Sequence, residues 1–332
     1  MANSHLPPEI LDCIVDILHD ELETLKGCRL VSKSWIPRTR RYLFAGIQFF
    51  SVETVESWKE NFPDPSNSPA YYTRTLSFRR AEAVTAAGGL TQSFSRVVRL
   101  ELTPEGGDPL SSFGKLEKTS LIPFHGFSPL KSLYMSSMTL SHPQILSLIR
   151  SSPFLEDLSL IGHDLDKDNN PDGLQAAAPW TSPALTGSLE LLMTGGIEYI
   201  TRRLLDLPGG LRFQQLMFSC LYYEDIWWRM ELVVGCSDTL ERLDIRCRPP
   251  CTFILAPYWS DDLPPSVGNS SSTPIDLSKA KKLRGLDFWP ESLNVGWITM
   301  TLQTITRHTR TPRSPTNLDL SASDLDPHRC RS

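Results

Sequence analysis

Two stretches of the sequence carry residue types that can bind metal ions. In "DLDKDNNPDGLQ", Asp164, Asp166 and Asp168 alternate as the first ligands of a calcium-binding loop do. Such a loop also needs a glycine at its sixth position and a bidentate glutamate at its twelfth. The sequence has Asn169 and Gln175 at these positions. We therefore interpret this stretch as a solvated acidic loop.

Cysteines form the second candidate. Cys247 and Cys251 lie close in sequence, but no second pair and no nearby histidine completes the four ligands of a zinc site. We interpret them as buried or free thiols, and we expect no metal and no cofactor. The seven cysteines are scattered and odd in number, which is typical of reduced thiols. This predicts a cytoplasmic or nuclear protein.

Known catalytic motifs are missing from the sequence. It contains no G-x-S-x-G, no P-loop, no H-E-x-x-H and no dinucleotide-binding fingerprint. It also lacks the cysteine and histidine framework of a RING domain, and none of its seven histidines lies in a recognisable catalytic setting. We therefore expect a protein that is not an enzyme. An enzyme with an unfamiliar motif is the alternative.

Composition and charge argue against two further classes. A net charge of -5 argues against a general nucleic-acid binder, which needs a basic surface. No apolar run approaches the roughly 20 residues that span a membrane. The N-terminus lacks the basic start of a signal peptide, and Asp12 and Asp16 interrupt its apolar run. With 40% hydrophobic and 21% charged residues, most of the 332-residue chain should fold as a globular protein.

The chain opens with a densely apolar segment, "LPPEILDCIVDILHDELETLKGCRLVSKSW", from Leu6 to Trp35. One stripe recurs at helical spacing: Ile10, Cys13, Ile14, Ile17 and Leu18. Pro7 and Pro8 suit a helix start, where a missing N–H costs little. We expect three short helices here, which bury little surface alone. They must pack against the rest of this chain or against another protein.

Two separated submotifs of this segment match one family. The first is "LPPEI" at residues 6–10, and the second is "CRLVSKSW" at residues 28–35. Together with an apolar tail at residues 42–44, they occur in the order and at the spacing of an F-box. Over residues 5–46 the chain therefore resembles F-box proteins.

This resemblance implies a partner. F-boxes bind the Skp-type adaptor of cullin–RING ubiquitin ligases, so the resemblance implies that adaptor and, through it, a cullin. The positions that match the family's adaptor-binding surface are Leu6, Pro7, Pro8, Glu9, Ile10, Leu18, Leu30, Val31 and Ser32. Trp35 matches a family tryptophan that either packs in the core of the F-box or contacts the adaptor. The alternative is that the helices only cap their own chain.

A short pattern, apolar-x-x-Leu-x-apolar, recurs after residue 70. Its central leucines are Leu76, Leu100, Leu133, Leu158, Leu189, Leu216, Leu243 and Leu286. Each copy is typical of a strand with alternating apolar residues. Helical patterns lie between copies at residues 142–152, 198–207 and 224–234, and residues 296–306 could form the helix of a last repeat. The spacings of the leucines run from 24 to 43 residues, most of them in or near the leucine-rich-repeat period of about 20–29 residues.

Strand–helix units of this length bury their apolar faces only by stacking. We therefore predict an α/β fold: a short N-terminal three-helix F-box, then an irregular leucine-rich-repeat-like solenoid with a curved parallel sheet. The resemblance to leucine-rich repeats is loose, because the consensus asparagine or cysteine after each strand is missing, as at Met138, His163 and Arg248. An ordinary α/β domain is the alternative.

Composition divides the chain into four parts. We assign residues 5–46 to the F-box, 47–72 to a connecting segment and linker, 73–306 to the repeat-like region, and 307–332 to a polar, poorly ordered tail. The repeat-like region is expected to recognise a substrate.

These features together predict a substrate-recognition subunit of an SCF-type ubiquitin ligase. The F-box would bind the adaptor, and the repeat-like region would bind an unidentified target protein, with loops 162–184 and 259–274 along its rim. Side chains that could contribute to the binding face are His163, Trp227, Trp228, Arg248 and Trp259, although for the adjacent tryptophans we favour packing. The alternative is a scaffold or binding module that uses the adaptor outside any ligase.

Overall fold

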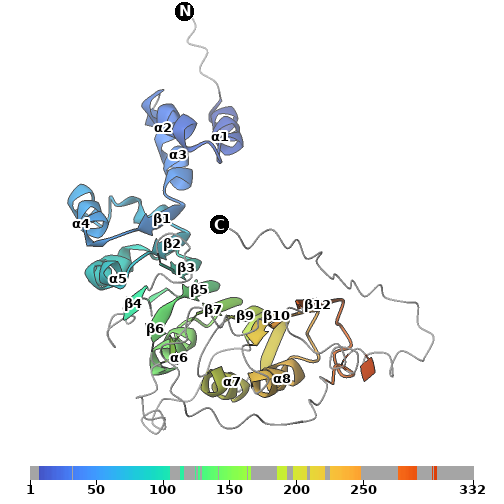
Figure 1. Ribbon diagram of the computed structural model, residues 1–332. Helices are drawn as coiled ribbons and strands as arrows, with labels where there is room; N and C mark the ends of the chain where they lie inside the picture. The colour runs from blue at the N-terminus through green and yellow to red at the C-terminus, as the bar shows by residue number, and fades with distance from the viewer. Residues whose placement is uncertain are drawn as a thin grey trace, which may run out of the picture. The chain divides into compact units, whose positions relative to one another are not determined.

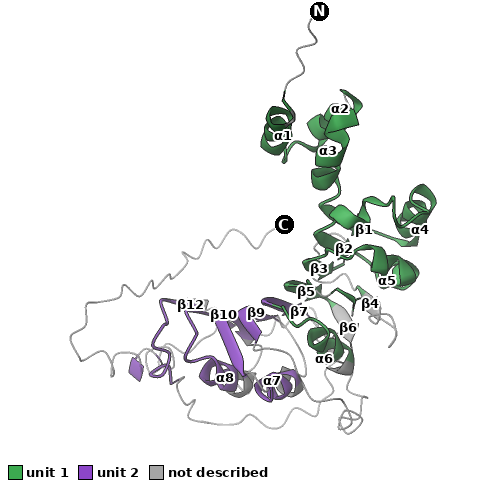
Figure 2. Cartoon of the chain, turned by 180° about the vertical axis from the view of Figure 1, so that it is seen from behind, with its two compact units in different colours: residues 1–155 green, residues 156–332 purple. Residues whose placement is uncertain are grey.

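The computed structural model divides the chain into two compact units, residues 1–155 and 156–332 (Figure 2). The residues that it describes are 7–31, 33–104, 113–115, 124, 126–127, 129–140, 142–162, 164–165, 185–192, 197–207, 210–220, 225–247, 276–289, 301 and 303–304. The predicted tail 307–332, loop 259–274 and most of loop 162–184 lie outside these residues.

Three helices open the first unit, as the sequence predicts. They are α1 Pro8–Ile17, α2 Leu22–Val31 and α3 Ile36–Leu43, with a single 3-10 turn at Lys33–Trp35. Pro8 and Pro37 stand in the first turns of α1 and α3, where a backbone N–H has no partner within the helix. In Figure 1, α1 lies beside the pair formed by α2 and α3.

A parallel sheet follows in the same unit. Its strands are β1 Gly46–Phe49, β2 Thr75–Phe78, β3 Arg99–Leu102 and β5 Ser132–Ser136, paired in that order. The helical elements are α4 Val52–Asn61, η2 Pro69–Tyr72, α5 Ala81–Ala87, η3 Gly88–Ser93 and α6 His142–Arg150. Parallel strands require such crossovers, because the chain must return to the same end of the sheet. In both views α4 and α5 lie on one side of the strands.

Helix α4 and all of strand β1 except Gly46 fall within residues 47–72, which the sequence treats as a connection. The pattern of β1 escapes notice because Ile47 takes the place of the central leucine and pairs with Leu76. Its Phe49 is buried, with its ring centroid 5.4 Å from that of Phe78 and 5.9 Å from that of Trp58. Aromatic packing therefore makes β1 and α4 part of the first unit rather than a linker.

A second, shorter pairing accompanies this sheet. Strand β4 Gly114–Lys115 runs parallel to β6 Met138–Leu140. The chain leaves β5 and enters β6 through Ser137, whose φ of 54° lies in the left-handed region. At Met138, where a leucine-rich repeat would place its asparagine, this chain starts another strand.

The second unit has the same design. Its strands β7 Asp157–Ile161, β9 Leu185–Leu192, β10 Leu211–Cys220, β11 Arg242–Cys247 and β12 Gly285–Trp289 pair in parallel in that order, and a short β8, Asp164–Leu165, follows β7. Helices α7 Ile197–Leu205 and α8 Asp225–Gly235 lie against each other at predicted positions. No helix within the described residues is both long enough and apolar enough to cross a membrane.

The central leucines of the predicted copies lie in register within each unit. In the first unit these are Leu76, Leu100 and Leu133, and in the second Leu158, Leu189, Leu216, Leu243 and Leu286. All of them are buried, and each stabilises the fold by about 1.5–3 kcal/mol relative to an exposed side chain. The predicted α/β class with parallel strands is therefore confirmed.

Candidate functional site

The three N-terminal helices share a small core. Val15 of α1 and Leu25 and Cys28 of α2 are buried. The buried Thr39 of α3 donates a hydrogen bond to the carbonyl oxygen of Trp35, at 2.9 Å. Because so few apolar side chains are buried, hydrophobic contacts stabilise this arrangement only modestly.

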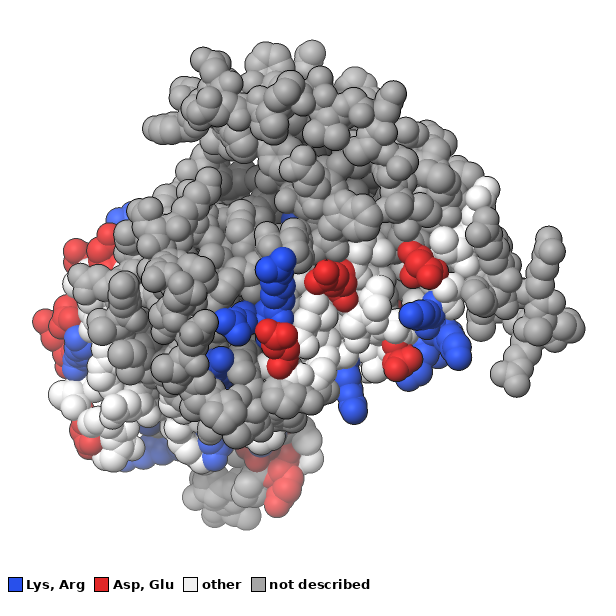
Figure 3. Space-filling view, turned by 90° about the horizontal axis from the view of Figure 1, so that it is seen from below, with Lys and Arg blue, Asp and Glu red and all other residues white. Residues whose placement is uncertain are grey.

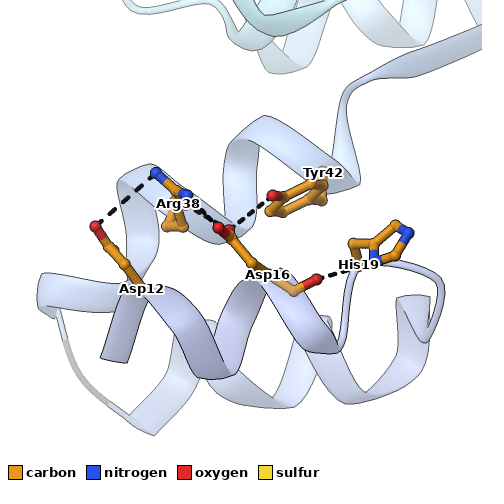
Figure 4. Close-up of polar contacts among 5 residues, drawn as sticks. All are labelled: Asp12, Asp16, His19, Arg38 and Tyr42. Atoms are coloured by element: carbon orange, nitrogen blue, oxygen red, sulfur yellow. Dashed lines mark hydrogen bonds and ion pairs between the residues drawn. The ribbon is translucent and has the colours of Figure 1, made fainter. Parts of the chain in front are cut away.

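A polar cluster joins α1 to α3 (Figure 4). Arg38 donates from Nε to Oδ1 of Asp16 at 2.7 Å, and its Nη2 donates to Oδ2 of the same carboxylate. The hydroxyl of Tyr42 donates to Oδ1 of Asp16 at 2.7 Å. Arg38 also lies 3.9 Å from the carboxylate of Asp12. A single carboxylate on α1 is thus held by two side chains from successive turns of α3.

These hydrogen bonds favour the ionised form of Asp16. The bond from Arg38, followed by that from Tyr42, lowers the pKa of the Asp16 carboxyl to about 2. The hydrogen bond to Asp16 correspondingly raises the pKa of Arg38 and the pKa of Tyr42. At neutral pH the cluster is therefore a carboxylate bound by a guanidinium group and a neutral phenol.

His19 follows α1 and lies next to this cluster. Its Nδ1 is 2.9 Å from the carbonyl oxygen of Asp16, and its ring centroid is 6.0 Å from that of Tyr42. Its Nε2 is 3.1 Å from the exposed carboxylate of Asp20. Asp20 makes its contact within this turn and reaches no residue of α3 by a hydrogen bond or ion pair among the described residues.

Several large apolar side chains of α1 and α2 face solvent. The exposed ones are Ile10, Ile17, Leu22, Leu30 and Val31, with exposed fractions of 79% at Ile17, 80% at Leu30 and 73% at Val31. Cys13 of α1 is exposed as well. Most of the apolar stripe predicted for α1 therefore lies outside the core of the three helices, and the buried Val15 is not part of that stripe.

The structure describes seven of the nine residues predicted to bind an adaptor. Pro7, Glu9, Ile10, Leu30 and Val31 are exposed, whereas Leu18 is half-buried. Pro8 begins α1, but its side chain lies outside the described part of the chain, as do Leu6 and Ser32. Trp35, whose role the sequence leaves open, is half-buried.

In each unit, residues between the apolar positions of the strands form polar pairs that sequence reasoning missed. The hydroxyl of Ser77 on β2 donates to Glu101 on β3 at 2.7 Å, and Ser159 on β7 donates to Glu190 on β9 at 2.5 Å. Both serines occupy the same place in the repeated pattern, directly after the central leucine. Burial opposes ionisation of Glu101, but hydrogen bonds from Ser77 and Arg99 lower its pKa.

Charged pairs occupy the corresponding positions of β11 and β12 in the second unit. Arg242 donates to Asp287 from Nη2 at 2.8 Å, and Arg246 donates to Asp244 at 3.2 Å. Asp244 and Asp287 are paired in the register, and both are buried. Burial raises the pKa of the Asp244 carboxyl, and the bond from Arg246 counteracts that effect. In the described part of the face drawn in Figure 3, basic and acidic side chains are likewise interspersed.

The two metal candidates of the sequence fall largely outside the described residues. Asp166, Asp168 and Cys251 lie outside them, and the side chains of Asp164 and Cys247 are not described. Among the residues that are described, no group of three His, Cys, Asp or Glu side chains is placed to hold a metal ion. The side chains predicted at the binding face, namely those of His163, Trp227, Trp228, Arg248 and Trp259, also lie outside this part of the chain.

Comparison with known proteins identifies no relative. No protein-family model matches the chain, and no curated protein matches it significantly. The resemblance to F-box proteins therefore depends on the two submotifs.

Proposed function

We propose that this protein is a substrate-recognition subunit of an SCF-type ubiquitin ligase. Its N-terminal helices bind a Skp-type adaptor and, through it, a cullin. Its repeat-like region binds a target protein. The protein contributes proximity rather than chemistry, because it holds the target near the enzyme that transfers ubiquitin.

The observation that carries this proposal is the apolar surface of α1 and α2. Ile17, Leu30 and Val31 are largely exposed, although they belong to a helical segment whose own core is small. Leu30 and Val31 are neighbours in the sequence, and contiguous exposed apolar side chains mark sites of protein interaction. Leu30 and Val31 lie inside the second submotif, so the exposed residues and the family resemblance point to the same surface.

The strands give independent support to the proposal that the repeat-like region binds a target protein. Within each compact unit, strand–helix repeats stacked in register produce a sheet with one apolar face and one polar face. Extended sheets of this kind serve as binding surfaces for other proteins. Glu101 in the first unit and Glu190 in the second each supply hydrogen-bonding groups for such a contact.

The proposal is tested by capture of partners with the tagged full chain from cells in which the proteasome is inhibited. We expect the Skp-type adaptor and a cullin to co-purify. A variant lacking residues 1–43 is the control; it keeps Phe44, whose ring packs against Trp58 and Phe62 at 6.1 and 6.2 Å. This variant should lose both partners and keep the target.

Three outcomes separate the proposal from its rivals. Adaptor together with cullin supports a ligase subunit. Adaptor without cullin would indicate a scaffold that uses the adaptor elsewhere. If the purified full chain fails to bind purified adaptor, the proposal is wrong and the N-terminal helices have another role.

A further inference from the structure

The exposed apolar residues of the N-terminal segment come from two helices that share one support. Ile10 and Ile17 belong to α1, and Leu30 and Val31 belong to α2. Helix α2 packs along α3. Helix α1 is joined to α3 by the side chain of Asp16, as Figure 4 shows. The relative placement of the two apolar patches therefore depends on how firmly each helix is attached to α3.

The apolar attachment of α1 is weak. Of its large apolar side chains, Val15 is buried, whereas Leu11 and Ile14 are half-buried and Ile10 and Ile17 are exposed. Full burial of one valine stabilises the contact by about 1.5–3 kcal/mol, and the half-buried Leu11 and Ile14 each add only part of such an amount.

The polar contacts between α1 and α3 are more specific in geometry than the apolar contacts of α1. Residues 9–23 contain six acids and no Lys or Arg, and residues 26–41 contain six Lys or Arg and no acid. Asp16 is bound by a guanidinium group through both of its oxygens and also accepts from a phenol. A guanidinium–carboxylate pair bound through two oxygens fixes orientation as well as distance. Hydrogen bonds from both Arg38 and Tyr42 allow α1 little rotation about its axis.

We propose that Asp16, Arg38 and Tyr42 form a positioning cluster, which fixes the orientation of α1 on α3 and so presents Ile10 and Ile17 to the adaptor in a preformed arrangement. This inference rests on the proposed function. Its physical basis is preorganisation: a helix that is already oriented loses less conformational freedom on binding. Without the cluster, the adaptor would have to order α1 at the expense of affinity.

The test compares Asp16→Asn with Asp20→Asn in the full chain. Both changes remove one carboxylate near the end of α1, but Asp20 pairs with His19 and, within the described residues, makes no hydrogen bond or ion pair to α3. We expect Asp16→Asn to bind purified Skp-type adaptor at least about tenfold more weakly, because it loses a charged partner of Arg38. Asp20→Asn should bind like the wild type.

Amide hydrogen exchange separates positioning from a general loss of fold. In free Asp16→Asn, the amides of α1 should exchange faster than in the wild type, while those of β2, β3 and β10 should be unchanged. With the adaptor bound, protection of α1 should return to the wild-type level. Lost protection throughout the free variant would mean that Asp16 only stabilises the fold, which would overturn the inference.

Two further variants test the same cluster through its other residues. Tyr42→Phe removes one hydrogen bond and should weaken binding by about two- to fivefold. The exchanged pair Asp16→Arg with Arg38→Asp should bind more tightly than either single variant, since it restores opposite charges across α1 and α3. If the wild type binds the adaptor and Asp16→Asn binds it equally tightly, the positioning role is wrong but the proposed function stands. If the wild type does not bind the adaptor, both the positioning role and the proposed function are wrong.

Discussion

Gly187 in β9 lies directly against the backbone of Glu156. A side-chain carbon added at Gly187 would overlap the carbonyl oxygen of Glu156 and stand 2.9 Å from its carbonyl carbon. The φ of Gly187 is also 80°, in the left-handed region that favours glycine. We therefore expect Gly187→Ala to lower the free energy of unfolding by about 2–4 kcal/mol, as measured by urea denaturation.

Gly210 provides the matched control, because its φ of 67° is similar but an added carbon would meet nothing within 4 Å. Gly210→Ala should therefore cost only the backbone strain, about 1 kcal/mol. Equal losses at the two positions would show that the close approach to Glu156 does not matter.

Leu243 is completely buried between its register partners Leu216 and Leu286. Leu243→Ala should lower the free energy of unfolding by about 2–5 kcal/mol, because it removes buried methyl groups and leaves a cavity. Val234→Ala, at an exposed position of α8, should change it by no more than about 0.5 kcal/mol. A small effect at Leu243 would contradict the stacked arrangement of central leucines.

The surface of α2 should affect partner binding without affecting the fold. Replacing Leu30 and Val31 together with Gln retains helix propensity at Leu30 and exposes no core residue. The melting temperature should stay nearly constant, while affinity for purified adaptor falls by about 100-fold or more in calorimetric titration. Val234→Gln is the control at an exposed apolar position of the second unit. A double variant that binds like the wild type would exclude this face.

Stability near Asp16 should depend on pH in the acidic range. Its pKa falls from an ordinary value of 3.8 to about 2 in the folded state. The unfolded chain therefore binds a proton first, so the stabilisation is complete above pH 3.8 and is lost as the pH falls toward 2. Urea midpoints should show this loss in the wild type and a smaller loss in Asp16→Asn. Identical pH profiles would contradict the bonds from Arg38 and Tyr42.

The described cysteines should differ in reactivity. Cys13 is exposed on α1, whereas Cys28 and Cys236 are buried, and burial raises the pKa of the Cys236 thiol to about 11. Because the thiolate is the reactive form, iodoacetamide should modify Cys13 first and Cys236 only after unfolding. Mass spectrometry would locate the modified residues. Bound adaptor should slow the reaction at Cys13, and an unchanged rate would place the adaptor elsewhere.

The strands of the repeat-like region could be predicted because alternation of apolar residues is a local property. Leu76 and Leu243 each lie in a pattern that needs no knowledge of distant residues. Strand β1 was missed because its pattern is short and centred on Ile47, and only the pairing with Leu76 reveals it. Its environment, not its own sequence, distinguishes it from a connection.

The candidate site was predictable in part. Helical spacing identified the apolar stripe that contains Ile10 and Ile17, but spacing alone does not tell which protein covers a stripe. The pairing of Asp16 with Arg38 spans 22 residues and depends on how α1 packs against α3. Segregation of acids and bases was the available signal, although it does not name the pair.

The register of the leucines has a consequence for how such a chain can change. Leu216 and Leu243 are 27 residues apart, and Leu243 and Leu286 are 43 residues apart, yet both pairs lie side by side in adjacent strands. Extra residues are thus accommodated between strands without a shift in pairing. Insertions and deletions in these connections can accumulate during evolution while the leucine stack is inherited unchanged, so the connections can diverge faster than the fold.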